Sequence, residues 1–172
     1  MPDVFLIKVS VTNPAEAMRN ALRAALQHNN TYASDVSVTS RDAFRYDWAK
    51  RIRGAARKYG CPMSDAEHCR VIAQIAQSLS SDYGTILAGE RLRFGTSQKA
   101  FNLYLKFLWR LGRIPAPPHC PVDGVILRLA RIAGSWTQSD SEAEYMRWIA
   151  TLREHAGRGL AEWEYEQWNR NG

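Results

Sequence analysis

The sequence predicts an all-α protein of about seven helices, with a short extended segment at its N-terminus. Apolar residues recur at intervals of three and four along most of the chain, which is the period of one helix face. Several of these stretches start at a capping residue and stop at glycine or asparagine, as helices do. The chain has 172 residues, of which 45% are hydrophobic and 23% charged. This is the size and composition of one globular domain, so we expect a single helical domain over residues 1–172.

The first half of the chain predicts an extended segment and three helices. Residues 4–11 (VFLIKVSV) are apolar and β-branched, which favours a strand or an extended arm. Asn13 and Pro14 then supply an N-cap and a first-turn proline for a helix that stops at an asparagine pair. A second helix ends at Gly60, and residues 64–67 (SDAE) form a capping box that opens a third.

The second half predicts a central helix and three shorter ones. Thr96 caps a helix that is apolar nearly all round and ends at Gly112, so we expect it to pass through the core. A proline-rich, stiff connector follows over residues 114–121 (IPAPPHCP). The remaining segments are a short helix and turn over residues 81–93, and helices over residues 122–133, 145–152 and 160–168.

The cysteines and the hydropathy bear on the compartment. Cys61, Cys69 and Cys120 are odd in number and widely spaced, which favours reduced thiols over a disulfide framework. No apolar run approaches the ~20 residues that a membrane span needs. The apolar stretch at the start is too short for a signal peptide. We therefore expect a cytoplasmic protein with no membrane partner, and a monomer.

Positive charge is concentrated in the middle of the chain. The net charge is +6, yet residues 91–131 hold eight Lys and Arg against Asp123 alone, a net of +7. A cationic block of this kind favours a polyanion partner, most commonly nucleic acid, although a solvated basic face is the other interpretation. Residues 41–58 hold seven further cations against two aspartates and form a second edge of the same predicted footprint.

Lys99 lies close to the predicted start of the central helix, behind a glycine turn. Unpaired backbone N–H groups at such a start bind anions, so this turn predicts a site for a DNA phosphate. The helix dipole and nearby arginines disfavour a cation there, which is one way to activate an amine as a nucleophile. The alternative is that Lys99 simply projects into solvent.

Asp123 opens the helix that follows the proline-rich connector. The helix dipole keeps a carboxylate ionised at that position, and Asp123 is the one acid in the basic block. A helix-capping role is the structural alternative. Taken together, Lys99 and Asp123 predict an amine and a carboxylate at two neighbouring helix N-termini.

Residues 89–133 resemble the helix-hairpin-helix DNA glycosylases. In that family a hairpin carries a catalytic lysine, and a Pro-Val-Asp-like segment then carries a catalytic aspartate. Residues 121–132 (PVDGVILRLARI) look like the second segment. Residues 98–100 (QKA), the long apolar helix and the proline-rich approach look most like the archaeal 8-oxoguanine glycosylase branch. The usual Leu-Pro-Gly-Val-Gly hairpin is replaced by residues 94–97 (FGTS), and no iron–sulfur cysteine cluster is present.

The resemblance implies a helix-hairpin-helix glycosylase-like bundle that excises a damaged or modified base from double-stranded DNA. Lys99 would attack C1′ and form a Schiff base, which also permits strand cleavage, and Asp123 would assist. No metal or organic cofactor is implied. The predicted DNA contacts are Arg91, Arg93, Gly95, Thr96, Ser97, Gln98, Arg110 and Arg128. The predicted base pocket holds Trp109, His119 and Trp136, chosen among the tryptophans that include Trp148, Trp163 and Trp168.

Two other classes of function stay open. The chain is alternatively a non-catalytic helical nucleic-acid-binding or regulatory protein, or an interaction module of a defence or mobile-element system with an acidic protein partner. The His-Cys pairs at 68–69 and 119–120 raise a zinc site, but no Cys-x-x-Cys spacing accompanies them. No nucleotide-binding glycine loop is present.

Overall fold

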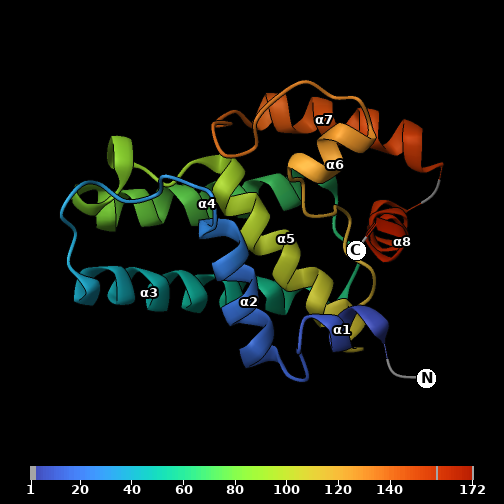
Figure 1. Cartoon of the computed structure of the whole chain (residues 1–172), viewed down its shortest axis with the longest axis horizontal. Helices are drawn as coiled ribbons and strands as arrows, with labels where there is room; N and C mark the ends of the chain where they lie inside the picture. The colour runs from blue at the N-terminus through green and yellow to red at the C-terminus, as the bar shows by residue number, and fades with distance from the viewer. Residues whose placement is uncertain (1–2, 158, 172) are drawn as a thin grey trace.

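The computed structural model describes residues 3–157 and 159–171, and this part of the chain is all-α, as predicted (Figure 1). Its only pairing of β type is one isolated bridge between Tyr32 and Leu87. The α-helices are α1 (Val4–Lys8), α2 (Pro14–Leu26), α3 (Val38–Ala56), α4 (Asp65–Tyr83), α5 (Phe94–Arg110), α6 (Gly124–Leu129), α7 (Glu142–Ala156) and α8 (Leu160–Asn171). Three 3₁₀ turns, Arg57–Gly60, Gly84–Ile86 and Ala88–Glu90, link α3 to α4 and α4 to α5.

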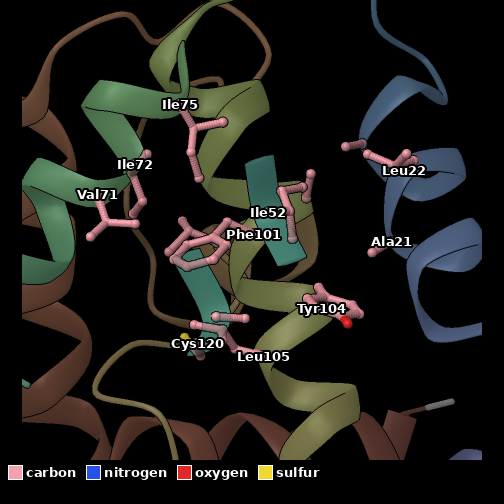
Figure 2. Packing of buried hydrophobic residues seen from close by; sticks show 14 of the residues in the cluster. Ala21, Leu22, Ile52, Val71, Ile72, Ile75, Phe101, Tyr104, Leu105 and Cys120 are labelled. Atoms are coloured by element: carbon pink, nitrogen blue, oxygen red, sulfur yellow. The ribbon is translucent and has the colours of Figure 1, made fainter. Parts of the chain in front are cut away.

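Helix α5 is the central element. It packs along α2 and against α3 and α4, and nearly all of its side chains are buried. Figure 2 shows Phe101 of α5 facing Ile52 of α3 and Ile72 of α4, while Tyr104 points toward α2. Burying each such apolar side chain contributes about 1.5–3 kcal/mol, so the packing around α5 is the main source of stability.

The helix boundaries follow the capping residues in several places. Asn13 accepts hydrogen bonds from the first turn of α2, and Pro14 is its first residue. Ser64 and Glu67 form the predicted capping box of α4. Helix α6 is shorter than the predicted 122–133 helix and begins after Asp123, which caps it.

The N-terminal segment is not extended, which corrects the prediction. Residues Val4–Lys8 form helix α1, because the Asp3 carboxylate accepts hydrogen bonds from the N–H groups of Phe5 and Leu6. Phe5 is buried and stacks on Phe107 of α5, with ring centroids 5.2 Å apart. The aromatic anchor and the cap outweigh the β preference of the branched side chains, which is weak and depends on context.

The start of α5 also differs from the prediction. The helix begins at Phe94, with Arg93 at the N-cap position, so Thr96 lies inside the first turn and is buried. Lys99 is then the sixth residue of the helix. Since the effect of the helix dipole falls off within the first turn, the dipole has little influence on Lys99. Within the described ranges, no helix combines the length and apolar character needed to cross a membrane.

Candidate active site

Lys99 and Asp123 are in direct contact. The Lys99 Nζ lies 2.6 Å from Asp123 Oδ2. Their side chains are 11% and 26% exposed, so the pair is largely shielded from water but reachable. Lys99 comes from the second turn of α5, and Asp123 comes from the end of the proline-rich connector. The predicted proximity of amine and carboxylate is therefore present in the structure.

The two oxygens of Asp123 have separate partners. Oδ1 accepts hydrogen bonds from the N–H groups of Val125 and Ile126, at 2.9 and 3.0 Å, and Oδ2 contacts Lys99. Burial acts to raise the pKa of Asp123, but the charge and hydrogen bond of Lys99 and these two N–H groups together lower it below the ordinary value. The carboxylate is therefore both a helix cap and an ionised partner of the amine.

A pocket of about 250 Å³ opens beside this pair, between α1, α2, α5 and α8. An adjacent pocket of about 200 Å³ along α6 shares Asp123, Glu164 and Trp168 with it. The larger pocket is lined by Phe5, Val9, Asn20, Arg23, Ala24, Gln27, Lys99, Leu103, Lys106, Phe107, Asp123, Glu164 and Trp168. The mixture of aromatic, aliphatic and charged walls suits a flat polar molecule.

A second ion pair lies in the wall of the same pocket. The Lys106 Nζ is 2.7 Å from Glu164 Oε2, and the two side chains are only 2% and 7% exposed. Burial lowers the pKa of Lys106 and raises the pKa of Glu164, and their mutual attraction opposes both shifts. Neither residue was predicted as a site residue from the sequence. A signal existed for Lys106, since it follows Lys99 by seven residues and so lies on the same face of the helix.

The predicted phosphate site at the start of α5 is not open, which corrects that expectation. Gly95, Thr96, Ser97 and Gln98 are all buried. The N–H of Gly95 donates to Ser139 O, and a Cβ at Gly95 would lie 1.8 Å from Trp136 O. The loop that precedes α7 therefore covers this turn.

Other polar groups of that turn also have partners within the chain. Thr96 Oγ1 accepts from the Asn29 side chain, and Ser97 Oγ donates to Ile72 O. The N–H of Phe94 donates to Asp140 Oδ1 at 3.0 Å. A carboxylate of the chain itself thus occupies the anion position at the start of α5.

The four arginines predicted to contact DNA have different surroundings. Arg91 pairs with Asp140 at 2.6 Å, and Arg93 donates to Thr137 O, so both hold the covering loop. Arg110 pairs with Asp3 and stacks over the Tyr165 ring. Three of the four therefore pair with distant segments of the chain, although the Arg91 side chain is still 58% exposed. Arg128 is exposed on α6, and its guanidinium lies near Gly124 at the start of that helix.

The three residues predicted for the base pocket line neither of the two pockets beside the pair. His119 is fully buried and hydrogen-bonds with Tyr145 OH and Asp65, at 2.9 and 3.0 Å. Trp109 packs edge-on against Tyr165, and the backbone of Trp136 covers the start of α5. Among the described residues that line the two pockets, the tryptophan is Trp168. It lies two helical turns beyond Leu160 in α8, and nothing local in the sequence separates it from the other tryptophans.

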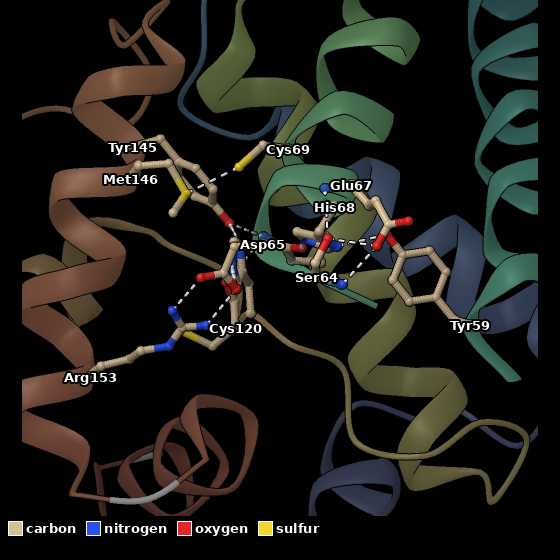
Figure 3. A network of polar contacts seen from close by, with 12 residues as sticks. Tyr59, Ser64, Asp65, Glu67, His68, Cys69, Cys120, Tyr145, Met146 and Arg153 are labelled. Carbon is tan, nitrogen blue, oxygen red and sulfur yellow. Dashed lines mark hydrogen bonds and ion pairs between the residues drawn. The ribbon is translucent and has the colours of Figure 1, made fainter. Parts of the chain in front are cut away.

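His119 belongs to a buried polar network between α4, α5 and α7. His68 hydrogen-bonds with Tyr59 OH at 2.7 Å and with Asn102 at 2.8 Å. Figure 3 shows Arg153 of α7 reaching Asp65 at the start of α4, which closes the network at the surface. Burial lowers the pKa of His68 to about 3 and that of His119 to about 4, so both are neutral near pH 7.

Comparison of the chain with protein-family models, with curated proteins and with solved structures gave no match. In the portion of the chain that the structure describes, no three His, Cys, Asp or Glu side chains converge as metal ligands would. The described cysteines, Cys61, Cys69 and Cys120, are thiols. The chemistry of the site therefore has to be argued from the Lys99–Asp123 pair and the pocket beside it.

Proposed function

We propose that this chain is a DNA glycosylase with lyase activity that excises a damaged or modified base through a Schiff base on Lys99. The observation that carries the proposal is the 2.6 Å contact between Lys99 Nζ and Asp123 Oδ2 at the wall of a pocket. A largely shielded amine within hydrogen-bond reach of a carboxylate that can take up its proton is one pairing of nucleophile and general base. The resemblance of residues 89–133 to the helix-hairpin-helix glycosylases supports the same reaction.

In the proposed reaction, protons pass between Lys99, Asp123 and the leaving base. Lys99 gives a proton to Asp123, and the neutral amine attacks C1′ of the flipped nucleotide. The bond from C1′ to the base breaks, and the base leaves with the electron pair and takes up the proton from Asp123. The new C1′–N bond then drives opening of the C1′–O4′ bond, the nitrogen loses one proton, and O4′ gains one. The product is a protonated imine, and water releases it or loss of a 2′ proton cleaves the strand.

The pocket supports a base as the group that enters. Enzymes that act on a base rotate it out of the duplex into a pocket, where it stacks on aromatic side chains and pairs with polar groups. Trp168 and Phe5 contribute aromatic lining, and the Lys106–Glu164 pair and the Lys99–Asp123 pair contribute the polar part of the wall. Since the walls combine both kinds of contact, a nucleobase fits them better than a purely apolar ligand.

Borohydride trapping tests the proposal. Borohydride reduces an imine to a stable amine, so the parent protein should become covalently attached to a duplex that carries its target base or an abasic site. Lys99→Gln should abolish the adduct and still unfold cooperatively, because an amide is not a nucleophile. Lys50→Gln, which alters an exposed lysine of α3, is the matched control and should trap as the parent does.

Abasic DNA also traps amines adventitiously, so the parent and Lys99→Gln must be compared on the same duplex. Equal trapping by both proteins would remove Lys99 as the nucleophile. If neither traps on a panel of oxidised, alkylated, deaminated and otherwise modified bases, lyase chemistry is excluded, and a non-catalytic nucleic-acid-binding protein becomes the better interpretation.

A further inference from the structure

Gln98 makes a two-point contact with the backbone of the residue before Asp123. Its Nε2 donates to Val122 O at 2.6 Å, and its Oε1 accepts from Val122 N at 3.2 Å. Gln98 is completely buried. The amide orientation is defined, because the carbonyl requires a donor and the N–H requires an acceptor. We refer to this contact as the Gln98 clamp.

Asn102, one turn further along α5, holds the clamp in place. Its Nδ2 lies within hydrogen-bonding distance of Gln98 Oε1 and of Cys120 O, 3.1 Å in each case. It also contacts Tyr145 OH at 2.9 Å, and its Oδ1 hydrogen-bonds with His68. Through Asn102, helices α4 and α7 therefore both hold the Gln98 side chain in place.

We propose that Gln98 is a positioning residue that sets the register of Asp123 against Lys99. This inference rests on the proposed function and adds a residue to it. Neighbouring residues of α5, Gln98 and Lys99, engage neighbouring residues of the connector, Val122 and Asp123. The clamp fixes the backbone of Val122, so the Asp123 carboxylate is already positioned to pair with Lys99. A displacement of 1 Å in such a pair is enough to reduce a rate about 10²-fold.

The Gln98 clamp accounts for the fixed position of the connector, which the Lys99–Asp123 ion pair alone does not. The segment from Ile114 to Asp123 has no helix of its own and carries four prolines, so its position depends on contacts with other elements. A single partly exposed ion pair contributes little to holding two segments together. The two hydrogen bonds from the fully buried amide are directional and shielded from water. They therefore fix the Val122 backbone and with it the position of Asp123.

Gln98→Glu gives the first test, because it makes the clamp depend on pH. A protonated carboxyl at position 98 still donates to Val122 O and accepts from Val122 N, whereas the ionised form loses the donor. Burial raises the pKa of a carboxyl above its ordinary value of about 4.3. We expect the single-turnover excision rate, divided by that of the parent, to be near 1 at about pH 5.5 and to fall at least about tenfold by about pH 9.

The native groups around Gln98 do not produce this change. The pKa values of His68, His119 and Asp123 are lowered, and those of Tyr145 and Cys120 are raised, so these groups lie outside that range. The remaining charged groups are Lys99 and the Lys106–Glu164 pair. Both proteins contain these groups, so their titration affects the two rates alike and cancels in the ratio of variant to parent. Gln74→Glu, on the exposed side of α4, is the matched control and should give a ratio near 1 throughout.

Gln98→Met is the second variant, and it separates the clamp from catalysis. It removes both hydrogen bonds without adding charge, so the excision rate should fall at least about tenfold at every pH. The Asp123 carboxyl carbon, followed by NMR, should titrate at a higher pKa than in the parent, because the contact with Lys99 is looser. Thermal unfolding identifies a variant that does not fold, and in that case the Gln98→Glu profile decides.

The outcomes of these measurements are distinct. A folded Gln98→Met with the parental rate and an unchanged Asp123 pKa would overturn the positioning role, as would a flat Gln98→Glu ratio once its carboxyl is shown by NMR to be ionised. If the parent excises no base at all, the proposed function fails. The clamp is then judged by the Asp123 titration alone, where a raised pKa supports it and an unchanged one overturns it.

Discussion

Asp123 both caps helix α6 and contacts the amine of Lys99. Oδ1 caps α6 and Oδ2 faces Lys99, so the capping role and the role beside the amine do not compete. The partners of the two oxygens differ in what they require from the side chain at position 123. A cap needs an acceptor, which asparagine also supplies, whereas the lysine needs a negative charge. A single substitution can therefore separate the two roles.

Asp123→Asn should keep α6 and lose most base release. The amide oxygen still accepts from Val125 and Ile126, but no charge remains to take the lysine proton or to stabilise a positive sugar. We expect the single-turnover excision rate to fall about 10²–10³-fold. The free energy of unfolding should fall by roughly 1–3 kcal/mol, since Lys99 loses its partner. Urea unfolding and excision assays measure the two effects.

Asp42→Asn is the control for this experiment, because Asp42 also belongs to an ion pair, with Arg45, but lies on the exposed side of α3. It should change neither quantity measurably, as is usual for surface ion pairs. If Asp123→Asn releases bases as fast as the parent, Asp123 is a helix cap and has no part in the reaction.

At the scale of elements, the start of α5 depends on the loop that covers it. Gly95 is the point of closest approach, since a Cβ there would lie 1.8 Å from Trp136 O and 3.1 Å from Ser139 O. Backbone atoms cannot move aside as a flexible side chain can. The loop and α5 therefore fit together only with glycine at this position.

Gly95→Ala should destabilise the protein by about 1–3 kcal/mol or more, because the covering loop has to move. Gly54→Ala provides the opposite case. Gly54 lies within α3, and a Cβ there would meet nothing within 4 Å. That substitution should stabilise the protein by roughly 0.5–1 kcal/mol, the helix preference of alanine over glycine. Urea unfolding of both variants checks the pair, and equal effects would show that the loop does not pack on α5 as described.

At the scale of the whole molecule, several arginines of the cationic block already have partners within the chain. Arg91, Arg93 and Arg110 are engaged by other segments of the chain. The arginines that remain near the Lys99 pocket come from different elements, with Arg23 in α2 at its wall and Arg128 exposed on α6. If a duplex places a nucleotide in this pocket, these two arginines are the candidates for contact with its phosphates.

Affinity for duplex DNA should therefore fall steeply with salt, as release of counterions requires. Arg23→Ala and Arg128→Ala should each reduce the slope of log affinity against log salt by about one. Arg70→Ala, on the exposed side of α4, should leave the slope unchanged. Fluorescence anisotropy with a duplex that carries a stable abasic analogue measures this without any excision. An affinity that does not depend on salt would contradict a nucleic-acid partner.

Short-range features were predictable from the sequence. The helical period, the Asn13-Pro14 start of α2 and the capping box of α4 depend on residues within one turn of each other, and the structure confirms them. The sequence also predicted an amine and a carboxylate at two neighbouring helix starts. The structure brings Lys99 and Asp123 into contact, although Lys99 lies in the second turn of α5 and not at its start. The chemistry assigned to the pair stays a proposal.

The tertiary structure alone decided which surfaces are covered. Asp140 and Ser139, some forty residues away in the chain, fill the α5 start that was expected to bind a phosphate. Gln98 therefore turns inward to Val122 and not outward to DNA, and Trp168 comes from the last helix to line the pocket. Caps and periodicity arise from local energies, whereas burial depends on segments that meet only when the chain folds.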